Sequence, residues 1–120
     1  MRLADILLLK AEALNESNDL AGAAALVNQI RSRAKLANTT ANTQTDMRLA
    51  IEKERRLELA FEGIRWFDLK RTGRAIEVMN NATGPGNIPL GYHLTQNRLV
   101  YPIPQAELDK NTKLTQNPGY

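Results

Sequence analysis

The chain has 120 residues, a formal net charge of +3 and no cysteine. This length suits one domain that buries about 65% of its unfolded surface. The lack of cysteine excludes disulfides, thiolate zinc sites and cysteine nucleophiles. No apolar run approaches the ~18 residues of a membrane-spanning helix. Its basic residues are interleaved with nearly as many acids, which does not favour nucleic-acid binding. We therefore predict one globular domain without a transmembrane segment.

The first 35 residues predict a helical hairpin, with helices over about 2–16 and 19–35. The first helix is apolar on most of its circumference and begins without a capping residue. Both facts lead us to expect that an upstream segment, absent from this chain, packs on it. The length and the small/large pattern of the pair resemble a tetratricopeptide unit, which cannot bury its face alone. The second helix has a predicted buried stripe of Leu20, Ala23, Ala24, Val27 and Ile30.

A polar linker over 36–45 leads into a second predicted helix pair, over 46–62 and 65–80. Thr43 or Thr45 is the expected cap of its first helix. Residues 46–74 hold 14 of the chain's 29 charged residues, both phenylalanines and the only tryptophan. Helical spacing predicts a buried stripe of Ala50, Ile51, Leu57 and Phe61, with Gly63 as the stop.

Acidic residues fall on or beside that stripe, where a carboxylate is costly unless a cation meets it. Arg55, Arg56 and Arg65 are the expected local partners, with Glu52–Arg56 and Arg55–Glu58 within one helical turn. We predict that arginines and acids lock against aromatic side chains in one structural network. Its members are Glu54, Arg55, Glu58, Glu62, Arg65, Trp66 and Asp68.

Residues 81–120 contain all five prolines and predict little regular structure. Residues 84–87 are an expected loop. Residues 94–101 are a short strand or an extended segment, and residues 105–109 form one helical turn. The end of the chain is expected to be held in place by Tyr101, Ile103, Leu108 and Leu114.

Four acids in the charged block are the candidates for general acid–base or glycosidase chemistry. Each has cations within a turn, and an arginine lowers a carboxylate's pKa, which is the wrong direction for a general acid. His93 is the only histidine, so no histidine pair is available for a metal and no triad forms around it. The structural interpretation is therefore favoured for all four acids, which are Glu54, Glu58, Glu62 and Asp68.

Two aromatic residues are candidates for a sugar-stacking platform. Trp66 lies at core spacing with Phe67 and Leu69, which favours packing over binding. Tyr92 lies in a loop beside Gly91 and is the freer aromatic. It is the candidate ligand-binding residue, although the pattern favours no role for it.

The block Glu54-Arg-Arg-Leu-Glu-Leu-Ala-Phe-Glu-Gly-Ile-Arg-Trp-Phe-Asp-Leu-Lys-Arg-Thr-Gly73 resembles the signature of the SusD/RagB family. The opening at residues 4–15 agrees with it, as do Tyr101-Pro-Ile-Pro104 and the final Gln116-Asn-Pro-Gly-Tyr120. Three blocks in the right order cover nearly the whole chain. They resemble the C-terminal part of such a protein.

The resemblance implies an all-α, non-enzymatic and cofactor-free segment of a surface lipoprotein of the outer membrane of Bacteroidota. Such proteins capture glycans or other oligomeric nutrients and pass them to a SusC-like TonB-dependent transporter. The lipid-bearing cysteine is not in this chain, and no ligand-binding residue is carried over. The alternative, which rests on residues 1–35, is a tetratricopeptide-like module that binds a peptide.

Overall fold

The structure is a computed structural model that describes residues 2–120, and it is all-α as predicted. No strand occurs in that range, which forms two compact units, Met1–Arg65 and Trp66–Tyr120. The elements are α1 (Leu3–Glu16), α2 (Leu20–Arg33), α3 (Gln44–Glu58), α4 (Arg65–Arg71), α5 (Ala75–Asn80), the 3-10 turns η1 (Pro85–Asn87) and η2 (Gln96–Leu99), and α6 (Gln105–Lys110).

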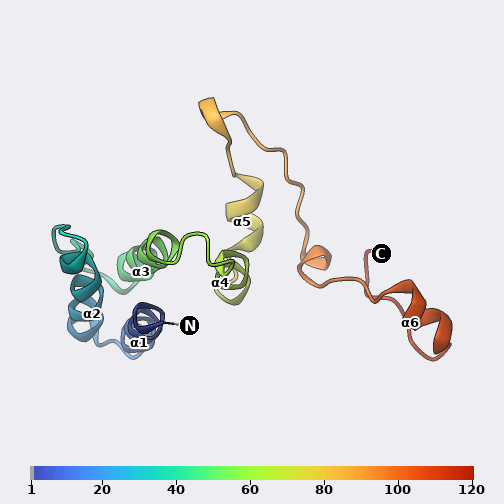
Figure 1. Cartoon of the computed structure of the whole chain (residues 1–120), viewed down its shortest axis with the longest axis horizontal. Helices are drawn as coiled ribbons and strands as arrows, with labels where there is room; N and C mark the ends of the chain where they lie inside the picture. The colour runs from blue at the N-terminus through green and yellow to red at the C-terminus, as the bar shows by residue number, and fades with distance from the viewer. Residues whose placement is uncertain (1) are drawn as a thin grey trace. The chain divides into compact units, whose positions relative to one another are not determined.

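Helices α1 and α2 form the predicted hairpin, and α3 packs against both (Figure 1). Leu8, Ala11, Ala23 and Val27 have no exposed surface, so the small alanines lie where the two helices meet. A side chain without bulk at such a position lets two helix backbones approach closely. Asp19 begins α2 by accepting a hydrogen bond from the Gly22 amide at 2.8 Å.

Helix α3 completes this core with Met47 and Ile51. It begins at Gln44, two residues earlier than predicted, and its cap is Thr43, one of the two predicted candidates. Thr43 Oγ1 accepts a hydrogen bond from the Asp46 amide at 3.0 Å. This cap satisfies one of the donors that a helix start leaves open. The linker before α3 is therefore connected to the helix at a defined residue.

The end of α1 is linked to the start of α3 by two reciprocal hydrogen bonds. Asn15 Nδ2 donates to the Gln44 carbonyl at 3.0 Å, and Gln44 Nε2 donates to the Asn15 carbonyl at 2.8 Å. Asn15 is 1% exposed, so its side-chain amide has the Gln44 carbonyl as its hydrogen-bond partner in place of water. These bonds set where α3 begins along α1.

The predicted end of α3 and two residues of its predicted stripe are wrong. The helix ends at Glu58 rather than at residue 62, because Phe61 and Gly63 adopt positive φ angles of 66° and 73°. Leu57 is 59% exposed and the Phe61 ring is fully exposed. The buried side of α3 is centred on Ile51, and Leu57 lies too far around the helix to share it.

The predicted helix over 65–80 is divided into α4 and α5. Gly73 has a φ of 73°, its amide donates to Lys70, and the next amide donates to the Leu69 carbonyl at 2.9 Å. This pair of bonds is the Schellman motif that ends helices at a glycine. The Thr72 hydroxyl reinforces the stop by donating to the Asp68 carbonyl at 2.9 Å.

The segment after α5 contains turns rather than the strand considered for residues 94–101, where the structure has η2. The single turn predicted at 105–109 is confirmed as α6. Polar bonds hold the end of the chain. Gln116 exchanges two hydrogen bonds with the backbone of Ile103, at 2.8 and 2.9 Å.

Two further contacts bind the final residues to the same backbone segment. Asn117 donates to the Tyr101 carbonyl at 2.7 Å, and the Tyr120 hydroxyl donates to the Val100 carbonyl at 2.9 Å. The prediction that apolar side chains hold this tail is wrong for Tyr101 and Leu114, which are 67% and 42% exposed. Prolines lack the amide hydrogen that a strand needs to pair with a sheet. Side-chain amides therefore hydrogen-bond the backbone groups of this segment instead.

The link between α1 and α3 predicts that Asn15→Ala lowers the free energy of unfolding by about 1–3 kcal/mol, because it removes a hydrogen bond from a buried site. The control is Ser17→Ala, which removes an exposed bond to the Ala13 carbonyl and should change stability by less than ~0.5 kcal/mol. Urea denaturation followed by circular dichroism measures both. Equal losses would show that the Asn15–Gln44 link does not stabilise the core.

Candidate functional site

The side of α3 that faces the hairpin carries charged residues, and one of them is a nearly buried arginine. Arg55 is 5% exposed, and its Nη2 donates to Asp5 Oδ1 at 2.9 Å. Its Nη1 donates to the Asp5 carbonyl at 3.3 Å. Asp5 lies in the first turn of α1, where the helix dipole also favours a carboxylate. Arg55 therefore links α3 to the start of α1.

Glu54, which is 4% exposed, makes the corresponding link to α2. Arg31 Nη1 donates to its Oε2 at 2.9 Å, while Arg31 Nε donates to the Ala37 carbonyl at 2.7 Å. One guanidinium thus joins α2, the linker and α3. Because Glu54 is buried, losing this cation would leave a carboxylate in a site with little water.

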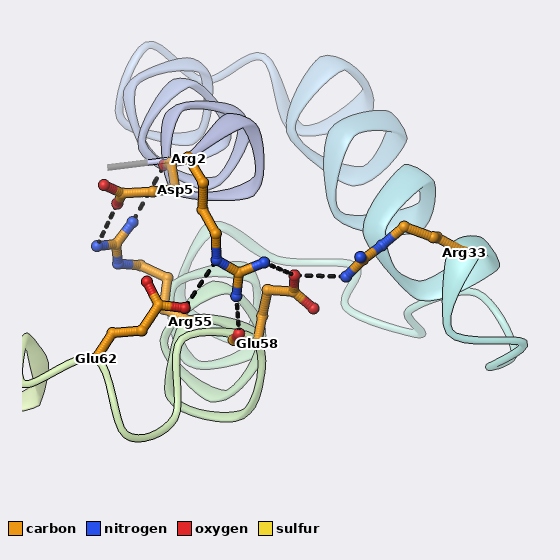
Figure 2. A network of polar contacts seen from close by, with 6 residues as sticks. All are labelled: Arg2, Asp5, Arg33, Arg55, Glu58 and Glu62. Carbon is orange, nitrogen blue, oxygen red and sulfur yellow. Dashed lines mark hydrogen bonds and ion pairs between the residues drawn. The ribbon is translucent and has the colours of Figure 1, made fainter.

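Arg2 and Arg33 enclose the Glu58 carboxylate at the end of α3 (Figure 2). Arg2 Nη1 donates to Glu58 Oε1 at 2.7 Å, and Arg33 Nη2 donates to the same oxygen. Arg2 also donates to the Glu58 carbonyl and, through Nε, to Glu62 Oε1 at 2.7 Å. The hydrogen bond with Glu62 is the main cause that raises the pKa of Arg2 above its ordinary value. Arg2 therefore holds both acids of the turn after α3.

Asp68, the last acid of the predicted network, also meets an arginine. So does Glu52, for which the predicted partner was Arg56. Arg65 Nη2 donates to Glu52 Oε1 at 2.8 Å, and Arg71 Nε donates to Asp68 Oδ1 at 3.0 Å. Asp68 is 7% exposed and belongs to the small buried region of the second unit, whereas the side chain of Arg71 is exposed.

The predicted pairing of Glu58 with Arg55 is wrong. Glu58 instead meets Arg2 and Arg33, and Arg55 meets Asp5. The residues that sequence reasoning missed come from α1 and α2 rather than from neighbouring turns of α3. Spacing within one helix does not reveal such pairs, although a charge beside an apolar stripe indicates that some partner is needed. The missed partners are Arg2, Asp5, Arg31 and Arg33.

Trp66 is partly buried and takes part in a cation–π contact. Lys70 Nζ lies 5.9 Å from its ring centroid and 5.7 Å from that of Tyr101. Such contacts attract a cation to an aromatic face. Phe67, expected to pack beside Trp66, is 64% exposed. The contact with Lys70 favours packing for Trp66 over an open sugar platform.

Tyr92 is the candidate ligand-binding residue, and its side chain is 46% exposed. The backbone next to it is fixed by Asn80, whose side chain accepts from the Leu94 amide at 2.7 Å and donates to the Leu94 carbonyl at 3.0 Å. No hydrogen bond to the Tyr92 hydroxyl occurs within residues 2–120. The neighbouring His93 is exposed. The structure therefore holds the loop in place but brings no cluster of polar side chains to Tyr92.

The arrangement of these charged side chains suits a structural role. Every acid considered for catalysis forms an ion pair with a guanidinium. Within the described part of the chain, no three His, Asp or Glu side chains are placed to hold a metal ion. None of its helices is long and apolar enough to cross a membrane.

The family model described as SusD family matches residues 1–120. The chain belongs to the SusD family. It is 42% identical over 128 residues to SusD-like protein P38 from Formosa agariphila, a match that covers 99% of this chain and 24% of that protein. SusD-like protein P2 from the same organism is 37% identical over 131 residues, and the match covers 25% of its length.

Solved structures agree with this assignment. A SusD-like protein from Bacteroides fragilis superposes with a TM-score of 0.86 at 32% identity, covering all of this chain and 25% of the other. A SusD superfamily protein from Bacteroides vulgatus gives a TM-score of 0.81 at 28% identity, with 27% of its chain covered. The present chain therefore spans about a quarter of the length of these relatives.

The buried position of Arg55 predicts that Arg55→Ala costs about 3–5 kcal/mol of stability, because the Asp5 carboxylate loses its cation. Arg48→Ala is the matched control on the same helix. Arg48 binds both oxygens of Glu16 at 2.6 Å, but the two side chains are 48% and 47% exposed. Chemical denaturation should give a much smaller loss for Arg48→Ala. Similar losses for the two variants would place Arg55 in a solvated environment.

The exposed pair of Arg48 and Glu16 predicts that stability depends on pH. The hydrogen bond from Arg48 holds the pKa of Glu16 below its ordinary value. A lowered folded-state pKa means that the contribution to stability is present above the unfolded pKa and is lost as pH falls through the folded one. NMR titration of the Glu16 carboxyl carbon should show this low pKa, and Arg48→Gln should return it toward the ordinary range. An unchanged pKa in that variant would exclude Arg48 as the cause.

Proposed function

We propose that this chain is the scaffold-forming C-terminal portion, a single domain over 1–120, of a SusD-like nutrient-binding protein that has no enzymatic activity and needs no cofactor. The observation that carries the proposal is the SusD family match over residues 1–120. The matched charges support the scaffold role, because Glu54 and Arg55 are used to join three helices. The protein as a whole would capture a glycan or another oligomeric nutrient.

The same proposal includes a place and a partner for the whole protein. It would act at the outer membrane of Bacteroidota, anchored by a lipid outside this segment, and hand its nutrient to a SusC-like TonB-dependent transporter. The family signature in residues 54–73 supports this through its resemblance to such lipoproteins. The proposal includes neither a nucleic-acid partner nor a membrane-spanning helix.

A second candidate function rests on the hairpin. A groove of about 450 Å³ lies between α1 and α2, and its lining includes Leu3, Leu7, Ile30, Arg2 and Arg33. Tetratricopeptide-like pairs can hold an extended or helical peptide in such a groove. A peptide library tests this alternative, and Leu3→Ser, at a residue that is 70% exposed, should abolish any binding without unfolding the chain.

The scaffold proposal predicts no hydrolysis of polysaccharides and no measurable binding when the chain is titrated calorimetrically with a panel of oligosaccharides. Sugar recognition combines a stacking ring with several convergent hydrogen-bonding groups, and Tyr92 has only the ring. Circular dichroism must first show that the chain is helical. Micromolar binding that Tyr92→Ala abolishes would contradict the scaffold role and place the ligand site in this segment.

A further inference from the structure

Helix α3 ends about one turn earlier than its sequence predicts. Gly63 has a φ of 73°, the usual conformation of the residue that follows a helix, so a helix that ended at Glu62 would have an ordinary stop. The helix instead ends at Glu58, and the chain turns at Phe61. The φ of Phe61 is 66°, which is unusual for a bulky residue and carries a conformational cost. Another interaction must therefore favour the earlier stop.

Arg2 occupies the acceptor that a longer helix would use. In a continued α-helix the Glu62 amide would donate to the Glu58 carbonyl, four residues earlier. In the structure Arg2 Nη2 donates to that carbonyl, and the Glu62 amide donates to the Leu59 carbonyl at 3.2 Å instead. Arg2 Nε also holds the Glu62 carboxylate at 2.7 Å (Figure 2). One guanidinium thus takes the place of the next helical donor and binds the residue that would have supplied it.

The charge of Arg2 suits the same position. The C-terminal end of a helix carries a partial negative charge, which a guanidinium beside its last carbonyls stabilises. Arg2 Nη1 also donates to Glu58 Oε1 at 2.7 Å, so the guanidinium binds both the backbone and the side chain of Glu58. Arg33 donates to this carboxylate oxygen too, but within the described residues it makes no bond to the Glu58 carbonyl or to Glu62. The contact that competes with the helical hydrogen bond therefore comes from Arg2.

We propose that Arg2 is a latch that selects between two ends of α3. With the latch closed, α3 ends at Glu58 and the Phe61 ring is fully exposed. With the latch open, α3 continues to Glu62 and ends at Gly63. The two ends are states of one equilibrium, and any change that weakens the contacts of Arg2 shifts it toward the longer helix.

Opening the latch would also move the Phe61 ring. Phe61 lies seven residues after Glu54, which is buried and paired with Arg31 of α2. Because seven residues are close to two helical turns, the longer helix would place the ring on the side of α3 that faces the hairpin. The turn is also the last segment of the first unit before Arg65, so the latch sets how the chain leaves α3.

Arg2→Met tests the latch, because methionine is similarly long and unbranched but has no charge and no donor. NMR spectroscopy of the whole chain should then show an NOE between the Glu58 Hα and the Glu62 amide, which a continued helix brings close. The control is Arg33→Gln, which leaves the Arg2 contacts in place and should leave the turn unchanged. Arg2→Met combined with Phe61→Gly should restore the turn, because glycine adopts a positive φ without strain.

A turn that keeps its conformation in Arg2→Met would overturn the proposal, and so would an equal change in Arg33→Gln. If circular dichroism shows that Arg2→Met does not fold, the unmodified chain supplies a second measurement. NaCl at about 1 M shortens the Debye length to about 3 Å and weakens the ion pair of Arg2 with Glu62, whose side chains are 41% and 37% exposed. The NOE between Glu58 and Glu62 should then appear, and its absence at high salt would contradict the latch.

Discussion

The first unit depends on the requirement that two charges buried by α3 find partners on other helices. Burying a guanidinium or a carboxylate costs several kcal/mol unless an opposite charge and hydrogen bonds replace the lost water. Arg55 meets this requirement at Asp5 of α1, and Glu54 meets it at Arg31 of α2. The two pairs leave α3 few ways to lie on the hairpin, since a rotation about its axis would strand one charge or both.

This requirement also favours a structural role over a catalytic one for a stretch rich in acids. A catalytic carboxylate must be able to reach the substrate, whereas these carboxylates are engaged in ion pairs that join helices. The glutamates of α3, Glu52, Glu54 and Glu58, are each held by an arginine, as is Glu62 in the following turn. Arg2, which holds two of them, is among the first residues of the chain. The residues that resemble the family signature therefore coincide with the parts of the sequence that connect helices, which supports the proposed scaffold role of this chain.

Features encoded within one or two helical turns could be predicted from the sequence. The hairpin follows from apolar periodicity, the start of α3 follows from the hydroxyl of Thr43, and the matched character of the acids follows from the cost of burying them. The partners of Glu58 could not be predicted, because Arg2 and Arg33 are far away in sequence and only the folded hairpin brings them together. The spacing of residues within α3 predicted Arg55 as the partner of Glu58 instead.

The errors at Phe61 and at the end of the chain have a different origin. An apolar residue at helical spacing was predicted to be buried, but the backbone leaves the helix before Phe61 and its ring points away from the core of its unit. In the last residues, side-chain amides rather than apolar contacts hold the proline-rich backbone. Periodicity detects neither effect, since both depend on where individual backbone groups find their hydrogen-bond partners.

The most direct test of the charge requirement is a double-mutant cycle on Asp5 and Arg55, with Asp5→Ala, Arg55→Ala and the double variant compared by urea denaturation. If the two residues stabilise the chain through each other, the double variant loses less than the sum of the single losses, with a coupling energy of about 1–3 kcal/mol. Additivity within ~0.5 kcal/mol would show that they act independently. The buried pair would then not be what holds α3 on the hairpin.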